Sequence, residues 1–347
     1  GVAQDYRQAV YWYTLAAEQG HMDAQHNVGT CYGDGRGVAQ DYAQAVYWFT
    51  LAAEQGHSNA QFNLGVSYAF GYGVTQDHAQ AVYWYMLAAE QGHIDAQNNL
   101  AACYYWGNGV AQDYGQAIYW YTQAAQQGDD SAQYKLAYSY HHGNGVAQDY
   151  VQAAYWYTLA AQQGHVDAQY KLANAYYYGY GVAQDYRQAV YWYTLAAEQG
   201  SGQAQNNLGH CYLLGEGVPQ NYEQAAYWFT QSAEQGHSYA QFYLGICYYF
   251  GYGVQQDYVQ AVHWLRLAAE QGDSDAQYTL GVCYYSGEGV SLDYEQAFYW
   301  FTQSAELGNA YAMNALGEMY EAGEGVPQDA EKAAYWYALA VENGYTE

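Results

Sequence analysis

Positive charge is scarce in this sequence. The chain of 347 residues has 7 lysines and arginines against 34 aspartates and glutamates, which gives a formal net charge of −27 at pH 7. A surface of this charge repels phosphate groups, so we expect neither nucleic acid nor an anionic membrane as a partner. Because no run of about 18 apolar residues occurs, we also expect no insertion into a membrane.

Cysteine is sparse as well, and all five cysteines stand at the same point of an internal repeat. Helices of a stacked array lie about 8–10 Å apart, whereas a disulfide needs its Cα atoms within about 7 Å. We therefore expect free cysteines that act as small packing residues. They are Cys31, Cys103, Cys211, Cys247 and Cys283.

The motifs that carry catalysis or bind cofactors are absent. The sequence has no H-E-x-x-H, G-x-S-x-G, C-x-x-C or P-loop, and its G-x-G triplets recur in a loop of every repeat, outside any dinucleotide fingerprint. Equivalent carboxylates of stacked repeats lie too far apart to share a cation, and the adjacent His141 and His142 point to different sides of a helix. We expect no enzymatic activity, no catalytic residue, no metal ion and no cofactor.

A period of 36 residues runs through the whole sequence. The glycine of a Gly-Val pair recurs at this interval from Gly1 to Gly325, and the stretch GVAQDYRQAVYWYTLAAEQG is identical at 1–20 and 181–200. A fixed period of this length indicates a repeat architecture. We predict a single repeat array over 1–347, with about nine units plus a terminal helix and no linker.

Each unit encodes two helices. Apolar or small residues at a helical spacing predict helix A over about 58–70 in one unit, and a second such stretch predicts helix B over about 77–91. Asp77 is a good N-cap, with Gln80 at the spacing of a capping box, and Gly92 suits the end of helix B. Helix B needs burial on more than one side, so units must stack into an all-α solenoid. Its residues expected to be buried are Ala81, Tyr83, Trp84, Leu87 and Ala88.

The frame A-Q-x-x-L-G-x-x-Y-x-x-G-x-G-V-x-x-D-Y-x-x-A-x-x-W-Y-x-x-A-A-E-Q-G resembles the Sel-one-like repeats, which are related to tetratricopeptide repeats. The resemblance covers essentially all of the sequence. It implies a right-handed α/α superhelical solenoid whose A helices line a concave groove, a role as an adaptor in protein assembly, and a bacterial secreted, periplasmic or surface-associated location. Two features depart from the family: Gln44, Gln80 and Gln116 replace a frequent lysine, and the paired cysteines of the cysteine-rich branch are missing.

Variation between repeats concentrates in helix A and the loop that follows it. Most of the 48 tyrosines belong to the repeat frame, but a further set falls in the columns that face the groove in tetratricopeptide relatives. Aromatic side chains with polar tips suit recognition surfaces. The predicted partner-binding residues are Phe62, Phe70, Tyr72, Tyr105, Trp106, Tyr134, Tyr138, His141, His142, Tyr170, Tyr177, Tyr178, Tyr180, Phe242, Tyr249, Phe250, Tyr252, Tyr278 and Tyr285.

Acidic residues flank this aromatic surface, so we predict a non-enzymatic scaffold that binds a protein or peptide segment with basic and apolar residues. These acids include Asp23, Asp34, Asp95, Asp167 and Asp275. Three alternatives stay open. They are aromatic residues that only fill the inner wall, a surface that binds glycans, and head-to-tail association of the chain into a filament.

Two more columns lie at the turn between units. Glutamate recurs near the end of helix B, as at Glu90, and we predict that it accepts hydrogen bonds from the first amides of the following helix A. Histidine recurs in the turn itself, where we predict a turn or capping role. These histidines are His21, His57, His93, His165 and His237.

Overall fold

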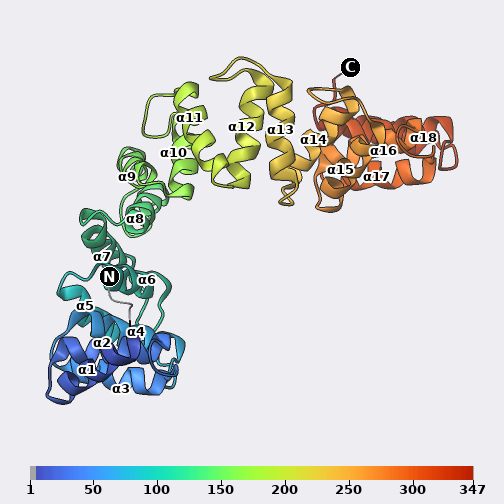
Figure 1. Cartoon of the computed structure of the whole chain (residues 1–347). Coiled ribbons are helices and arrows are strands. Elements are labelled where there is room, and N and C mark those ends of the chain that lie inside the picture. The colour runs from blue at the N-terminus through green and yellow to red at the C-terminus, as the bar shows by residue number, and fades with distance from the viewer. Residues whose placement is uncertain (1–4, 347) are drawn as a thin grey trace. The chain divides into compact units, whose positions relative to one another are not determined.

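A computed structural model describes residues 5–346 of the chain (Figure 1). All regular secondary structure in this range is α-helical, in nineteen helices of 12 or 13 residues. The A helices are α2 (Met22–Asp34), α4 (Ser58–Phe70), α6 (Ile94–Trp106), α8 (Asp130–His142), α10 (Val166–Tyr178), α12 (Gly202–Leu214), α14 (Ser238–Phe250), α16 (Ser274–Ser286) and α18 (Ala310–Ala322). The B helices are α1 (Tyr6–Glu18), α3 (Tyr42–Glu54), α5 (His78–Glu90), α7 (Tyr114–Gln126), α9 (Tyr150–Gln162), α11 (Tyr186–Glu198), α13 (Tyr222–Ala233), α15 (Tyr258–Glu270), α17 (Tyr294–Glu306) and α19 (Ala330–Glu342). The predicted all-α solenoid of two-helix repeats is confirmed.

Two compact units divide the chain. Unit 1 holds Gly1–Ala168 with Tyr180–Val182, and unit 2 holds Gln169–Gly179 with Ala183–Glu347. In unit 1 each of the helices α1 to α8, and in unit 2 each of the helices α11 to α18, packs against the next helix along the chain. No helix among the described residues combines the length and the apolar character that crossing a membrane requires.

The start of helix B is fixed by its aspartate, as α5 shows. Oδ1 of Asp77 accepts hydrogen bonds from the backbone N–H groups of Ala79 and Gln80 at 2.9 and 3.0 Å, which confirms the N-cap. The expected capping box is wrong, because the Gln80 side chain does not accept the N–H of Asp77. The N–H of Asp77 donates to the carbonyl of Tyr68 at 2.9 Å, so it does not need the Gln80 side chain.

The G-x-G loop ties each repeat to the one before it. Gly107 ends α6 in the left-handed region at φ 74°, and Gly109 has the same φ. A Cβ atom on Gly109 would lie 2.2 Å from the carbonyl oxygen of His78 at the start of α5. The loop therefore requires glycine for its backbone conformation and for the close approach to the preceding B helix.

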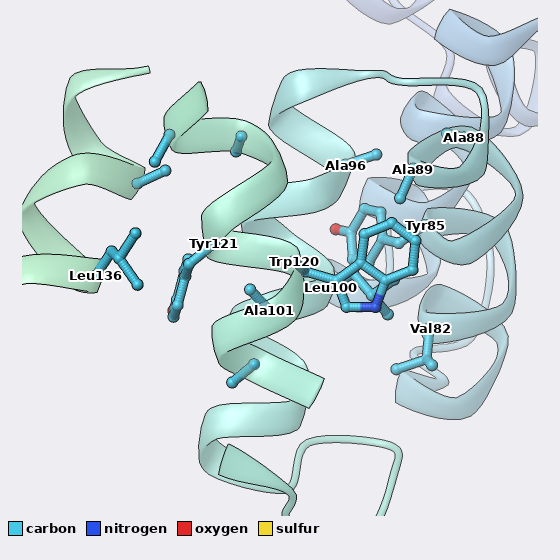
Figure 2. Close-up of a cluster of buried hydrophobic side chains, with 14 of the residues drawn as sticks. Val82, Tyr85, Ala88, Ala89, Ala96, Leu100, Ala101, Trp120, Tyr121 and Leu136 are labelled. Atoms are coloured by element: carbon cyan, nitrogen blue, oxygen red, sulfur yellow. The ribbon is translucent and has the colours of Figure 1, made fainter. Parts of the chain in front are cut away.

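Small residues and aromatic rings alternate in the core between repeats. Figure 2 shows Tyr85, Leu100 and Tyr121 within a cluster formed by α5 to α8, and all three are almost fully buried. Helix glycines make room for such rings, because a Cβ on Gly65 would lie 2.6 Å from Cδ1 of Tyr85.

The predicted burial of helix B holds for only some of the residues named for it. Ala81 and Ala88 lie in the core, but Trp84 and Leu87 are half-buried and 53% of Tyr83 is exposed. The ring that enters the core belongs instead to Tyr85, two residues later. Successive repeats therefore leave a row of frame tyrosines at the surface.

A glutamine ladder links the repeats on the side of the turns. Nε2 of Gln61, on α4, donates to the carbonyl of Ala53 at 3.1 Å, and its Oε1 accepts from Nε2 of Gln91 at 2.7 Å. The bond between two glutamine side chains joins residues 30 positions apart, and it recurs along the array. The donors are Gln55, Gln91, Gln127, Gln163, Gln199, Gln235 and Gln271.

Histidines of the turn cap the A helices. Nδ1 of His57, His93 and His165 accepts the backbone N–H three residues later, as predicted. His21 and His237 occupy the same position without a side-chain cap bond.

The predicted role of Glu90 is wrong. The amide of Ala96 in the first turn of α6 donates to His93, and the exposed side chain of Glu90 takes part in none of the hydrogen bonds found in the described residues. The histidine of the turn, and not the preceding glutamate, accepts the hydrogen bond from the first turn of α6. The five cysteines, in contrast, are free as expected.

Candidate functional site

The predicted partner-binding residues fall into an exposed group and a half-buried group. The exposed residues are Phe70, Tyr72, Trp106, His142, Tyr178, Tyr180, Phe250 and Tyr252. The half-buried residues are Phe62, Tyr105, Tyr134, Tyr138, His141, Tyr170, Tyr177, Phe242, Tyr249, Tyr278 and Tyr285. Among the phenylalanine, tyrosine and tryptophan residues of this set, Trp106 has the largest exposed fraction, 68%, followed by Phe70 with 63%.

One pocket recurs on the surface of the A helices at intervals of two repeats. Its floor is the core aromatic of a B helix, and its walls are the last turn of one A helix and the middle of the next. We name each pocket after the residue at one equivalent position, which gives the Asn63, Lys135 and Asn207 pockets. Their floors are Phe49, Tyr121 and Tyr193.

The Asn63 pocket is the widest and is polar at its rim. It encloses about 590 Å³ between α2, α3 and α4. Asp34 and Arg36 form an ion pair of 3.3 Å at its edge, and Nδ2 of Asn63 lies 3.1 Å from Nε2 of His26. The ring of Tyr72 lines the other side.

The Lys135 pocket is small and aromatic. It encloses about 230 Å³, and Tyr105, Trp106, Tyr134 and Tyr138 line it together with Lys135 and the floor ring. Burial lowers the pKa of Lys135 below its usual range, and Asp129 offsets part of that effect. Burial also raises the pKa of Tyr134 to about 12, so its phenol is neutral at physiological pH.

The Asn207 pocket, of about 350 Å³, is lined by aromatic rings and amides. Oη of Tyr193 donates to Oδ1 of Asn174 at 2.5 Å, and Nδ2 of Asn207 donates to Oη of Tyr193 at 3.2 Å. His210 also lines the pocket, and burial lowers its pKa, which keeps the imidazole neutral at pH 7. The exposed rings of Tyr178 and Tyr239 complete it.

Four of the half-buried tyrosines are held by the next G-x-G loop. The hydroxyl of each one bonds to the side chain of the middle loop residue 39 positions later. The pairs are Tyr105 with Asn144, Tyr177 with Glu216, Tyr249 with Glu288 and Tyr285 with Glu324. These tyrosines can present the face of the ring to a ligand, but their hydroxyl groups are already engaged.

Where the loop residue is itself a tyrosine, it stacks on the start of the preceding B helix. Tyr72 lies 5.2 Å from Tyr42, and Tyr252 lies 5.0 Å from Tyr222, between ring centroids. Phe70 and Phe250 in turn stack on these loop rings at 5.7 and 5.4 Å.

Other predicted residues pack against the capping histidines or within helix A. Phe62 stacks on His93 at 4.7 Å, and Tyr134 stacks on His165 at 4.6 Å. Tyr138 stacks on His142, whose Nδ1 lies 2.9 Å from the carbonyl oxygen of Tyr138. The wall-filling interpretation therefore accounts for part of this set.

The remaining predicted residues lie outside the three pockets. Tyr170 lies 6.2 Å from the ring of Tyr193, and Tyr278 lies 5.8 Å from that of Phe301. Phe242 packs against the core of α15 and α16.

The residues that set the polarity of each pocket are not among the predicted partner-binding residues. Asn63, Lys135 and Asn207 stand one position after a predicted groove column, and no motif marks them. The signal that could have found them is the change from asparagine to lysine within one repeat column.

A second aromatic row lies on the B helices. We call it the B-helix stripe; its exposed tyrosines are Tyr11, Tyr47, Tyr83, Tyr119, Tyr155, Tyr191, Tyr227, Tyr299 and Tyr335. Each ring makes an edge contact with the tryptophan that follows it. The stripe is nearly invariant between repeats, whereas the A-helix pockets differ.

The Sel1 repeat profile matches residues 1–21, 23–57, 58–93, 94–129, 130–165, 166–201, 202–237, 238–273, 274–309 and 310–345. The chain belongs to the Sel1 repeat family. This confirms the resemblance seen in the sequence, and it counts ten Sel1 repeats, of which the first match, 1–21, contains the single helix α1.

Solved structures with Sel1 repeats have the same fold. A protective antigen present in uropathogenic Escherichia coli strains, which displays an SLR fold, is 41% identical over 99% of this chain and 75% of its own, with a TM-score of 0.91. A Sel1 repeat protein from Oxalobacter formigenes is 34% identical over 86% of this chain and 87% of its own, with a TM-score of 0.66. No curated protein matches the chain. Sel1 repeats typically form scaffolds for protein interaction, and no comparison identifies a partner.

Proposed function

We propose that this Sel1 repeat protein is a non-enzymatic scaffold that binds a protein segment along its A-helix surface. The recurring pocket carries this proposal: the same position holds an aromatic floor in three places, and the side chains around it differ from repeat to repeat. A surface that only filled the inner wall would have no reason to vary these side chains while the helices stay nearly identical.

Exposed rings supply the contact area. Phe70, Trp106, Tyr178 and Phe250 each end an A helix with more than half of the side chain open to solvent. Rigid aromatic residues bury a large area at a low cost in side-chain entropy, and they dominate binding energy where they enter a partner's surface. The pockets between them are large enough for single side chains of a bound segment.

Net charge favours a segment with basic residues. The chain carries −27 at pH 7, and acidic side chains such as Asp34 and Glu216 lie at the pocket rims or bond to their tyrosines. Such a field accelerates the approach of cationic segments and disfavours acidic ones. Apolar residues of the segment would fill the aromatic pockets.

The experiment compares two double variants of the intact chain on an array of short peptides that vary in charge and apolar content. The groove variant carries Phe70→Ser and Trp106→Ser; the stripe variant carries Tyr83→Ser and Tyr119→Ser. Both variants replace two exposed aromatic residues of unit 1, and both are checked for unchanged helicity and melting temperature.

We expect the unchanged chain to retain basic, apolar peptides and the groove variant to bind them at least about tenfold more weakly, which corresponds to about 1.4 kcal/mol. The stripe variant should bind within about twofold of the unchanged chain. Equal losses in both variants, or a loss only in the stripe variant, would contradict the A-helix surface as the binding site.

A further inference from the structure

We propose that the Lys135 pocket holds a carboxylate, presented by an aspartate or glutamate side chain of the bound segment. The inference rests on the proposed function and adds to it one acidic residue at a defined place within a segment that is otherwise basic and apolar.

The ammonium group of Lys135 forms no ion pair with any of the described residues. It projects from the middle of α8, and its Nζ lies 5.3 Å from the centre of the Tyr121 ring. The ion pairs of the described chain do not include it, so no carboxylate oxygen lies within 4.0 Å of Nζ, and Nζ donates none of the hydrogen bonds found there. An ammonium group with only an aromatic face beside it retains three unused donors.

The acid that acts on Lys135 is committed elsewhere. Asp129 is the N-cap of α8, and its Oδ1 accepts from the N–H of Ala132 at 2.7 Å and from Nδ2 of Asn98 at 2.6 Å. It opposes the effect of burial on the lysine only from a distance. A carboxylate that entered the pocket could instead accept a charge-assisted hydrogen bond from Nζ directly.

The dimensions of the pocket favour a single side chain. Its volume of about 230 Å³ is below the range of about 300–1,000 Å³ that is usual for small-molecule sites. The rings of Tyr105, Trp106 and Tyr138 would contact the methylene groups of an acidic side chain, while its carboxylate reaches the ammonium group. Burial of the pair between rings strengthens the attraction relative to water.

The repeat fold does not require lysine at this position. Asn63 and Asn207 occupy the equivalent places in the other two pockets, on A helices of the same length. An asparagine is therefore a compatible replacement. Lys135 therefore places a positive charge in this pocket, although the protein as a whole has a strongly negative net charge.

The chain offers a direct readout because it has three lysines, Lys135, Lys171 and Lys332. Lysine labelled with ¹³C at Cε gives one NMR signal for each, and the signal that is missing in Lys135→Asn identifies the pocket. The probes are 3-phenylpropionate and its neutral amide, 3-phenylpropanamide, which have nearly the same shape.

We expect the acid to shift the Lys135 signal in a saturable manner and the amide to bind at least about tenfold more weakly. In Lys135→Asn, the two remaining lysine signals should show no saturable shift with either probe, whereas Lys171→Asn, the matched control, should keep the shift of the Lys135 signal and its preference for the acid. Equal binding of the two probes to the unchanged chain, no saturable shift with either, or the same shift in all three lysines would overturn the carboxylate site. None of these outcomes depends on the peptide array that tests the A-helix surface.

A second arm tests the source of the carboxylate. A peptide that the A-helix surface retains and that contains one glutamate is compared with its glutamine form. Loss of affinity on that change in the unchanged chain, but not in Lys135→Asn, would support a segment side chain. If the acid probe occupies the pocket while the peptide change has no effect, the pocket serves a free carboxylate and the segment assignment is overturned.

Discussion

Leu307 stands where a glutamine would donate to Oε1 of Gln277, and that oxygen is buried without a hydrogen-bond partner. In seven other repeat junctions of the described chain, a glutamine 30 residues later makes this bond, at 2.7 to 2.9 Å. The bonds between glutamines therefore end at Gln271, two repeats before the array does. Met313 likewise replaces the next glutamine of the ladder, and its side chain is buried.

Leu307→Gln should stabilise the chain. The new amide would donate to Gln277, and a net gain of about 1 kcal/mol is typical for a hydrogen bond that satisfies a buried acceptor. The urea midpoint of the last unfolding transition should rise, because repeat arrays unfold through local contacts between neighbours. The reverse change, Gln127→Leu, would leave Oε1 of Gln97 unpaired and should lower stability by about 1–3 kcal/mol. A stabilising effect of Gln127→Leu would show that the ladder bonds contribute nothing.

The fold could be predicted from the sequence because its determinants are local and repeated. Asp77 caps α5 by accepting hydrogen bonds from the free amides of its first turn. An aspartate before a helix start has this role generally, and the repeat places an equivalent residue before the B helices. The left-handed glycines at fixed places end helix A in the same way each time. If the boundary of a helix is predicted wrongly from one unit, the equivalent positions in the other units reveal the error.

The candidate site could be predicted only in part, because it depends on contacts between repeats. Tyr177 belongs to a variable column, but its hydroxyl is fixed by Glu216 from the following loop, a pairing that a single unit does not reveal. Tyr83 and Tyr85 have the same side chain and similar sequence surroundings, yet one is exposed and the other is buried. Which of them faces the neighbouring helix depends on how the units stack.

Tyr249 and Glu288 should be energetically coupled. Oη of Tyr249 donates to the carboxylate of Glu288 at 2.5 Å. Burial raises the pKa of Tyr249 most, and this hydrogen bond raises it further. A double-mutant cycle of Tyr249→Phe and Glu288→Gln should give a coupling of about 1 kcal/mol in the free energy of unfolding. The matched cycle of Tyr83→Phe and Glu288→Gln, with no contact between the two residues, should be additive. A zero coupling for the first pair would mean that the loop does not hold the tyrosine.

Stability should fall on mild acidification through the histidine caps. Nδ1 of His93 accepts from the N–H of Ala96, which requires a neutral ring, and burial lowers the pKa of His93. The unfolded state then binds more protons than the folded state, so the contribution is complete above about pH 6.5 and is lost as the pH falls from there towards the lowered folded value. Burial lowers the pKa of His26 as well, and it adds in the same direction.

The matched variant for this pH effect is His93→Ser, because Ser201 caps α12 at the equivalent position. Serine does not titrate, so the loss of unfolding free energy between about pH 7.5 and about pH 5.5 should be smaller in the variant, by up to about 1 kcal/mol, the usual contribution of a cap. An identical pH profile for both proteins would rule out the cap at His93 as a source of the pH dependence.

Gly109 and Gly92 should respond very differently to alanine, although both have a positive φ. Any non-glycine residue in this region costs about 1–2 kcal/mol from its own backbone. A Cβ on Gly92 would meet no atom within 4 Å, so Gly92→Ala should lower stability by that cost alone. A Cβ on Gly109 would lie 2.2 Å from the carbonyl oxygen of His78, which is backbone and cannot turn away. Gly109→Ala should therefore cost more than about 3 kcal/mol, since the loop must leave the preceding B helix. Urea denaturation of the two variants measures this difference, and equal effects would mean that the G-x-G loop does not join neighbouring repeats.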